Sequence, residues 1–169
     1  MFKVMESRGL RATALVGGVM ALGLSLSGCG LLTGNGPDRD PSSGAITNTA
    51  TSDPFQIKVG DCLQDPGTTS IEKVVTLPCS KPHDFEAFDR VEMKGSDYPG
   101  TAETKKQSEA FCSPAFAKFV GVAYDDSTLE MQFFYPTSDS WGQGDREILC
   151  LIAGKDGAKT TGTLKGAKK

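Results

Sequence analysis

The chain has 169 residues, which is enough for one domain of ordinary size with flanking segments. Its 18 Lys and Arg residues and 21 Asp and Glu residues give a net charge of −3. Nucleic-acid-binding domains concentrate positive charge to meet the phosphates, so this balance argues against a nucleic-acid partner.

The first 28 residues have the pattern of a bacterial export signal. Lys3, Arg8 and Arg11 precede the uncharged and mostly apolar stretch 12–26. That stretch is too short to cross a bilayer as a helix, which takes about 20 residues, but it has the length of a signal-peptide core. We therefore expect residues 1–28 to be absent from the mature protein.

The apolar stretch ends in Leu26-Ser27-Gly28-Cys29, which resembles the lipobox of bacterial lipoproteins. In that motif the cysteine receives a diacylglyceryl group, and the signal is cut off in front of it. Two acyl chains hold a protein durably on a membrane. The sequence thus predicts a lipid anchor at Cys29 on the extracytoplasmic face of the cell membrane. The alternative is an ordinary secretion signal with a chance cysteine near its end.

Composition divides the rest of the chain into three parts. Residues 29–54 are rich in small and polar residues, so we expect a disordered tether behind the lipidated cysteine. Residues 55–153 hold every Tyr, the only Trp and eight of the nine Phe, and are predicted to form the globular domain. Residues 154–169, rich in Gly, Thr and Lys, are expected to be a solvated tail. The alternative for this tail is a weak basic arm that touches anionic lipid headgroups.

The chain has five cysteines, and setting Cys29 aside leaves four in the domain: Cys62, Cys79, Cys112 and Cys150. An even number in an exported domain indicates two disulfides. Of the three connectivities we favour Cys62–Cys79 and Cys112–Cys150, because each pair then joins neighbouring or sequential elements. The rival interpretation is a metal or redox site, but C-x-x-C is missing and there is a single histidine. We expect no metal and no cofactor.

Two strands are predicted before the helical region. The first, 71–77, is apolar and β-branched and follows a turn at 60–62. The second, 84–93, alternates between two faces. One face carries Phe85, Ala87, Val91 and Met93, and the other carries Asp84, Glu86, Arg90 and Glu92. Phe88 and Asp89 break the alternation, which indicates a bulge or a partly covered outer face.

The helical region is 101–120, and we expect it to break into two helices at Ser113-Pro114. Serine is a good helix cap and proline a good first helical residue. Alternation in 129–135 predicts a half-buried strand, and the continuously apolar 148–153 predicts a central strand covered on both faces. The order β-β-α-β-β predicts a small, disulfide-stapled α+β domain with an antiparallel sheet.

The sequence contains no P-loop pattern, no H-E-x-x-H and no G-x-S-x-G. A histidine-dependent triad could use only His83. We therefore expect that the protein is not an enzyme.

Two side chains are candidates for binding. His83 follows Pro82 and the disulfide at Cys79, and is either a hydrogen-bonded structural histidine or part of a ligand site. Trp141 is either a plug packed on the sheet or an exposed anchor for a partner.

Several short motifs line up along the chain. They are Gly60-Asp61-Cys62, Cys79-Ser80-x-Pro82-His83-x-x-Glu86, a helix with Cys112, and Pro136-x-x-x-x-Trp141-x-x-Gly144-x-Arg146 leading to Cys150. Together, over about 59–152, they resemble the septum-formation domain of actinobacterial membrane proteins and lipoproteins. The resemblance implies a link to envelope building at the division site. It brings no established catalytic residues.

The leading hypothesis is a non-enzymatic, lipid-anchored interaction module in septum or envelope assembly, held on the membrane through Cys29. Its partner would be an envelope or division protein that the sequence does not identify. The alternative is a lipoprotein that captures a small molecule, metal ion or wall fragment near His83 and Trp141. A small hydrolase is a third class, because one histidine and several acids could still converge.

Overall fold

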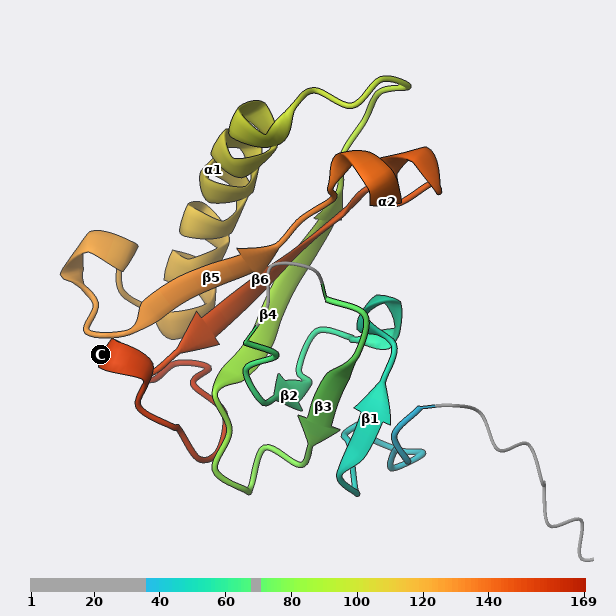
Figure 1. Cartoon of the computed structure of the whole chain (residues 1–169). Helices are drawn as coiled ribbons and strands as arrows, with labels where there is room; N and C mark the ends of the chain where they lie inside the picture. The colour runs from blue at the N-terminus through green and yellow to red at the C-terminus, as the bar shows by residue number, and fades with distance from the viewer. Residues whose placement is uncertain (1–35, 68–70) are drawn as a thin grey trace, which may run out of the picture. The chain divides into compact units, whose positions relative to one another are not determined.

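The residues described by the computed structural model, 36–67 and 71–169, form a six-stranded antiparallel sheet in the order β1-β3-β2-β4-β6-β5 (Figure 1). The strands are β1 (Ala50–Ser52), β2 (Cys62–Leu63), β3 (Val74–Leu77), β4 (Phe85–Glu92), β5 (Glu130–Phe134) and β6 (Glu147–Ala153). The helices are α1 (Thr101–Val120) and α2 (Ser138–Gly142), with 3-10 turns η1 (Pro54–Gln56), η2 (Tyr124–Asp126) and η3 (Lys155–Gly157). The predicted signal peptide and the predicted anchor Cys29 lie outside the described residues.

The α+β fold class is confirmed, and β6 is an interior strand, between β4 and β5, that is covered on both faces. Ile148, Cys150 and Ile152 face the cluster built around α1, whereas Leu149 and Leu151 face a second cluster on the opposite side of the sheet. A strand that alternates between two buried faces is apolar throughout, which explains its continuous hydrophobic sequence. Figure 1 shows α1 lying across the face of the sheet formed by β4, β5 and β6.

The predicted break at Ser113-Pro114 is wrong, because α1 runs unbroken from Thr101 to Val120 with Pro114 inside it. Proline removes one backbone hydrogen bond from a helix interior and is costly there. Tertiary contacts hold the helix on both sides of that position: Cys112 is bonded to β6, and Phe116 is fully buried. The helix ends at Gly121, which has a φ of 91° and donates to Ala117 O.

Both favoured disulfides are confirmed. Cys62–Cys79 joins β2 to the turn after β3, with 5.2 Å between the Cα atoms, and Cys112–Cys150 joins α1 to β6 at 5.6 Å. The first disulfide stabilises the part of the sheet formed by β1, β3 and β2. The second fixes the helix to the part formed by β4, β6 and β5.

The register of β4 against β6 shifts between Ala87 and Asp89, so the predicted bulge is present. The shift changes which face the later side chains cover. Ala87 belongs to the second cluster, whereas Val91 and Met93, four and six residues further on, belong to the cluster around α1. The expectation that Glu86 lies on an outer charged face is wrong, because Glu86 is 2% exposed.

The prediction of a disordered tether is wrong for residues 36–54. β1 pairs with β3, an isolated bridge joins Arg39 to Ile46, and Ile46 is buried. The segment lacks the apolar content for a core of its own, but it completes the edge of an existing sheet. The backbone groups of β1 are thereby paired with those of β3.

The prediction of a solvated tail for residues 154–169 is wrong as well. His83 and Thr160 exchange backbone hydrogen bonds of 3.0 and 2.9 Å, and Leu164 is 5% exposed in the cluster around α1. This C-terminal segment therefore completes the fold across the start of β4.

Candidate functional site

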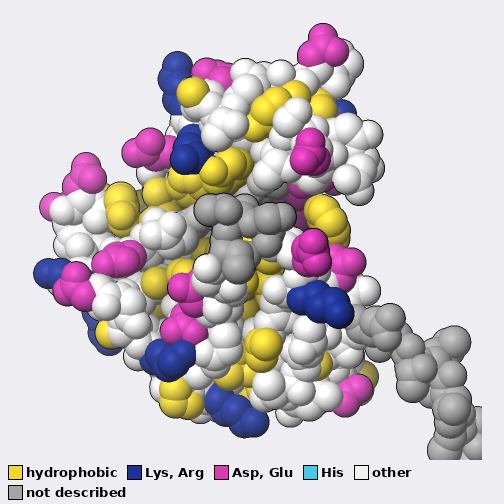
Figure 2. Space-filling model, viewed as in Figure 1, with side chains coloured by type: hydrophobic (Ala, Val, Ile, Leu, Met, Phe, Trp, Pro, Cys, Tyr) yellow, Lys and Arg dark blue, Asp and Glu magenta, His cyan; other side chains and the backbone are white. Residues whose placement is uncertain are grey.

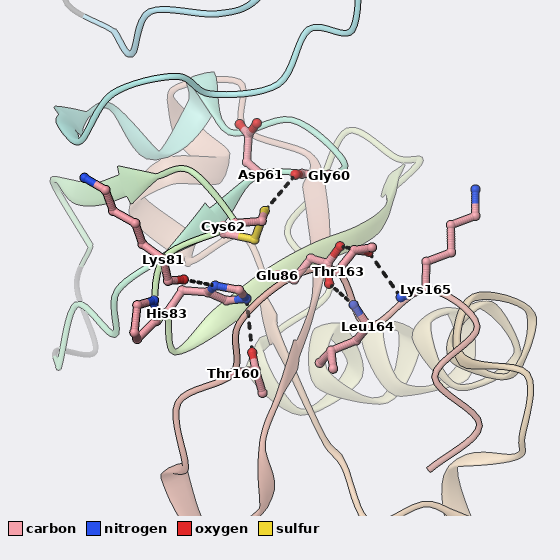
Figure 3. Close-up of a disulfide and its surroundings, with 12 residues drawn as sticks. Gly60, Asp61, Cys62, Lys81, His83, Glu86, Thr160, Thr163, Leu164 and Lys165 are labelled. Atoms are coloured by element: carbon pink, nitrogen blue, oxygen red, sulfur yellow. Dashed lines mark hydrogen bonds between the residues drawn. A yellow bond between two sulfur atoms is a disulfide. The ribbon is translucent and has the colours of Figure 1, made fainter.

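His83 is fully buried between the start of β4 and the C-terminal segment (Figure 3). Its Nδ1 lies 2.8 Å from the carbonyl oxygen of Lys81, and its Nε2 lies 3.0 Å from Thr160 Oγ1. A carbonyl can only accept, so Nδ1 carries a hydrogen and donates it to Lys81 O, while Nε2 shares a hydrogen bond with the threonine hydroxyl. Both ring nitrogens are therefore occupied within the protein.

Glu86 holds the next part of the same segment. It accepts hydrogen bonds from Thr163 Oγ1 at 2.6 Å and from the backbone N–H of Leu164 at 2.7 Å, as Figure 3 shows. The two bonds join Glu86 to residues 77 and 78 positions later in the sequence. A buried carboxylate is tolerated only when such donors satisfy it, so Glu86 acts as a clamp for the C-terminal segment.

Asp84 adds an ion pair at the rim, with Lys159 Nζ at 2.6 Å from Asp84 Oδ2. Burial by itself would raise the pKa of Asp84. The hydrogen bonds from Lys159 and from the backbone N–H of Asp65, together with the lysine charge, outweigh burial and hold that pKa below its ordinary value.

Trp141 is buried at 5% exposure, so the alternative of an exposed anchor is wrong and the plug interpretation holds. Its Nε1 donates to Ser96 O at 2.9 Å, and the Arg146 guanidinium carbon lies 3.7 Å from the ring centre. Arg146 also donates to Trp141 O at 2.8 Å. The tryptophan thus fastens α2 to the loop between β4 and α1.

His83 and Trp141 do not form one site. His83 precedes β4, whereas the Trp141 contact at Ser96 lies past the other end of this eight-residue strand. At about 3.3 Å per residue the strand separates them by about 26 Å. Neither side chain is accessible to a ligand in this conformation.

The residues of the short motifs that resemble the septum-formation domain therefore maintain the fold. Gly60 has a φ of 92°, Asp61 binds Arg39, the cysteines form disulfides, and Gly144 has a φ of 99° between Trp141 and Arg146. A surface that recognises a partner has to be sought elsewhere.

The strongest candidate is a groove of about 550 Å³, which we call the acidic groove. Its apolar lining comes from separate parts of the chain: Phe55, Ile71, Phe85, Phe134 and Leu149. In Figure 2 hydrophobic side chains lie along a hollow that crosses this face below α2, and acidic side chains lie beside it. Phe85, Phe134 and Leu149 belong to the second cluster, so the floor of the groove is the sheet face opposite α1.

The charges around the groove have one sign. Asp65, Asp145 and Glu147 line it, and the described residues of its lining include no Lys or Arg. Burial raises the pKa of the Glu147 carboxyl, although Arg90 beside it, at 3.2 Å, acts in the opposite direction. A positively charged group in the groove would relieve that cost, so the arrangement favours an apolar and basic occupant.

A second hollow, also of about 550 Å³, shares Phe55 with the acidic groove and has the opposite charge. Arg39, Lys58 and Arg90 line this basic hollow, and its described lining includes no Asp or Glu. Phe55 is part of both linings. The Arg90–Glu147 ion pair links a residue of one hollow to a residue of the other.

Sequence reasoning missed both hollows. Their linings combine η1, β4, β5 and β6, and several of the residues are ordinary polar or aromatic side chains without a motif. The one signal in the sequence was Phe55, a large aromatic residue that follows a proline in a polar segment. In the structure its side chain is 64% exposed.

Within 36–67 and 71–169, we find no group of three or more His, Cys, Asp or Glu side chains placed to hold a metal ion. The helices of the same residues are also too short or too polar to cross a membrane.

A family model described as Septum formation matches residues 29–169. The chain belongs to the septum-formation family. The match extends the expected range of about 59–152 at both ends, and so includes the N-terminal and C-terminal segments that pack on the sheet. The family's description connects the chain with the division septum and hence with the cell envelope. No curated protein and no solved structure matches the chain.

Proposed function

We propose that this septum-formation protein is a lipid-anchored interaction module on the extracytoplasmic face of the cell membrane. It catalyses no reaction, and it binds an envelope or division protein through the acidic groove. Cys29, at the end of the export signal, carries the lipid. The observation that carries the proposal is the groove itself, an apolar hollow with three carboxylates and no cation in its described lining.

The floor of the groove is preorganised. Leu149 is 2% exposed and lies in β6, which pairs with β4 on one side and β5 on the other. The disulfide at Cys150 fixes the same strand to α1. A rigid floor loses little entropy on binding, so apolar contacts made there contribute to affinity with a small ordering cost.

The rim selects the partner. Asp65 is exposed, while Asp145 and Glu147 are half-buried beside the apolar floor. We infer a partner segment with an apolar side chain for the floor and one or more Lys or Arg residues for the rim.

The test places positive charge on the rim. Asp65→Lys with Gln132→Lys changes two exposed residues of the groove, and Asp125→Lys, which changes an exposed acid in η2, is the control. Tagged versions are followed in dividing cells at low expression. We expect the groove variant to lose enrichment at division sites while it remains on the membrane, and the control to keep both.

The Cys29→Ala variant tests the anchor separately. It should no longer incorporate a labelled fatty acid, whereas the groove variant should incorporate it as the parent does. Normal septal enrichment of the groove variant, with an unchanged melting temperature, would contradict the role of the groove. Fatty-acid incorporation into Cys29→Ala at the parent level would contradict the anchor.

The groove volume also falls in the range of small-molecule sites, about 300–1,000 Å³, which supports capture of a small molecule or wall fragment as the second candidate function. Thermal shift assays with soluble wall fragments separate the two. A rise in melting temperature that is absent in the Asp65→Lys, Gln132→Lys protein would favour the ligand function.

A further inference from the structure

The basic hollow lies where the chain leaves the described structure toward Cys29. Gly36 and Pro37 are part of its lining, next to Phe55, Lys58 and Val59. A Cβ atom on Gly36 would come within 2.9 Å of Gln56 Oε1, so this glycine lies directly against η1. The first described residue of the chain is therefore a wall of the hollow.

The distance from this wall to the predicted anchor is limited by covalent geometry. Gly36 is seven residues after Cys29, and an extended chain covers at most about 3.6 Å per residue. The wall of the hollow at Gly36 therefore lies within about 25 Å of the Cα atom of Cys29. This limit holds for any conformation of the intervening residues.

The side chains around the hollow combine apolar surface with positive charge. Phe55 is 64% exposed and Val59 is 49% exposed, which makes them the two most exposed large apolar residues among the described ones. Lys58 is exposed between them. Arg90 is 54% exposed, and Glu147 neutralises it only in part across 3.2 Å. Arg39 is already paired with Asp61 and contributes little free charge.

We propose that the basic hollow is a second, non-covalent membrane contact, which seats the domain on anionic phospholipid. Phe55 and Val59 enter the boundary between headgroups and acyl chains, and Lys58 and Arg90 pair with headgroup phosphates. The proposal rests on the proposed function in one respect, the lipid anchor at Cys29, which keeps this face near the bilayer. Since Phe55 also borders the acidic groove, that groove would open beside the membrane surface.

The experiment attaches the lipid chemically. Residues 29–169 contain the whole compact unit Gly34–Lys169 with its own core, and Cys29 is the one cysteine outside the two disulfides. It can therefore be coupled to a maleimide phospholipid in vesicles of phosphatidylcholine, with or without phosphatidylglycerol. A Phe55→Trp variant then reports depth by the quenching of its emission by brominated lipids.

The control reporter is Val75→Trp, which replaces the third exposed large apolar residue, in β3 and outside the lining of the hollow. Both proteins carry the same buried Trp141 as background. We expect Phe55→Trp to be quenched in vesicles with phosphatidylglycerol and Val75→Trp to show only the background. Adding Lys58→Glu should reduce membrane contact at least about fivefold, because one lysine near an anionic surface contributes about that factor.

Lys165→Glu is the matched charge reversal in the C-terminal segment, where Lys165 is exposed. It should leave the quenching unchanged. The proposal is overturned if Phe55→Trp is quenched no more than Val75→Trp, or if Lys165→Glu rather than Lys58→Glu abolishes the contact. Natural acylation of Cys29 does not enter this measurement, so a failure of the anchor in cells would be seen separately, in the Cys29→Ala test.

Discussion

Arg39 and Asp61 form a two-pronged ion pair, in which Nη1 and Nη2 of the arginine each donate to one carboxylate oxygen at 2.6 Å. Arg39 lies ten residues after Cys29, and Asp61 lies in the turn that opens β2. The pair therefore fixes the segment next to the predicted anchor onto the sheet. Its geometry makes the short N-terminal segment part of the domain.

Arg39→Gln should lower the free energy of unfolding by about 2 kcal/mol, since hydrogen bonds to charged groups contribute about 1.5–3 kcal/mol. Asp61 is 3% exposed, so the loss of its partner leaves a buried carboxylate under-satisfied. Urea denaturation under non-reducing conditions measures the change. The Arg39→Gln, Asp61→Asn double variant is the control for coupling. A single-variant loss below about 0.5 kcal/mol, the size of an ordinary surface substitution, would contradict the pair.

Glu86→Gln should release the C-terminal segment. The amide keeps the shape of the side chain but loses the two charge-assisted bonds from Thr163 and Leu164, which we expect to cost about 2 kcal/mol. Limited proteolysis reports the effect directly, as faster cleavage within 154–169. Lys165→Ala, an exposed residue of the same segment, should leave the cleavage rate at the parent level. Equal protection of the Glu86→Gln protein would mean that the clamp does not hold the segment.

Acidification should destabilise the domain through Asp84. Its pKa is lower in the folded state than in the unfolded chain, so its contribution is complete above the ordinary pKa of about 3.9 and is lost as the pH falls through the folded value. Unfolding free energies of the parent and of Asp84→Asn should thus differ most above about pH 4 and converge at lower pH. Lys159→Gln, which removes the cation, should weaken the same pH dependence. A difference that stays constant from pH 6 to pH 2 would exclude this role for Asp84.

Local patterns predicted most of the sheet. Alternation located β5, the continuous apolar run located the central strand β6, and the irregular pair Phe88-Asp89 marked the bulge in β4. These signals work because side chains alternate between faces along a strand. The disulfide pairing could also be predicted, because each bond joins elements that are close in sequence or consecutive in the fold.

The errors arose where distant contacts decide the structure. Pro114 stays inside α1 because Cys112 and Phe116 are held by the sheet, which no helix-capping rule takes into account. The C-terminal segment has a single large apolar residue, Leu164, and its ordering depends on Glu86, 78 residues earlier. A segment of such composition is predicted to be disordered when its contacts with distant parts of the chain are not known.

The most direct measurement of the central claim is site-specific photocrosslinking in dividing cells from position 132 in the acidic groove. A photoreactive residue in place of Gln132 should give one discrete adduct with an envelope or division protein, and Asp65→Lys in the same chain should abolish it. The same photoreactive residue at Val75, which is exposed outside the groove, should give no such adduct. Equal adducts from both positions, or an adduct at position 132 that survives Asp65→Lys, would contradict recognition through the acidic groove.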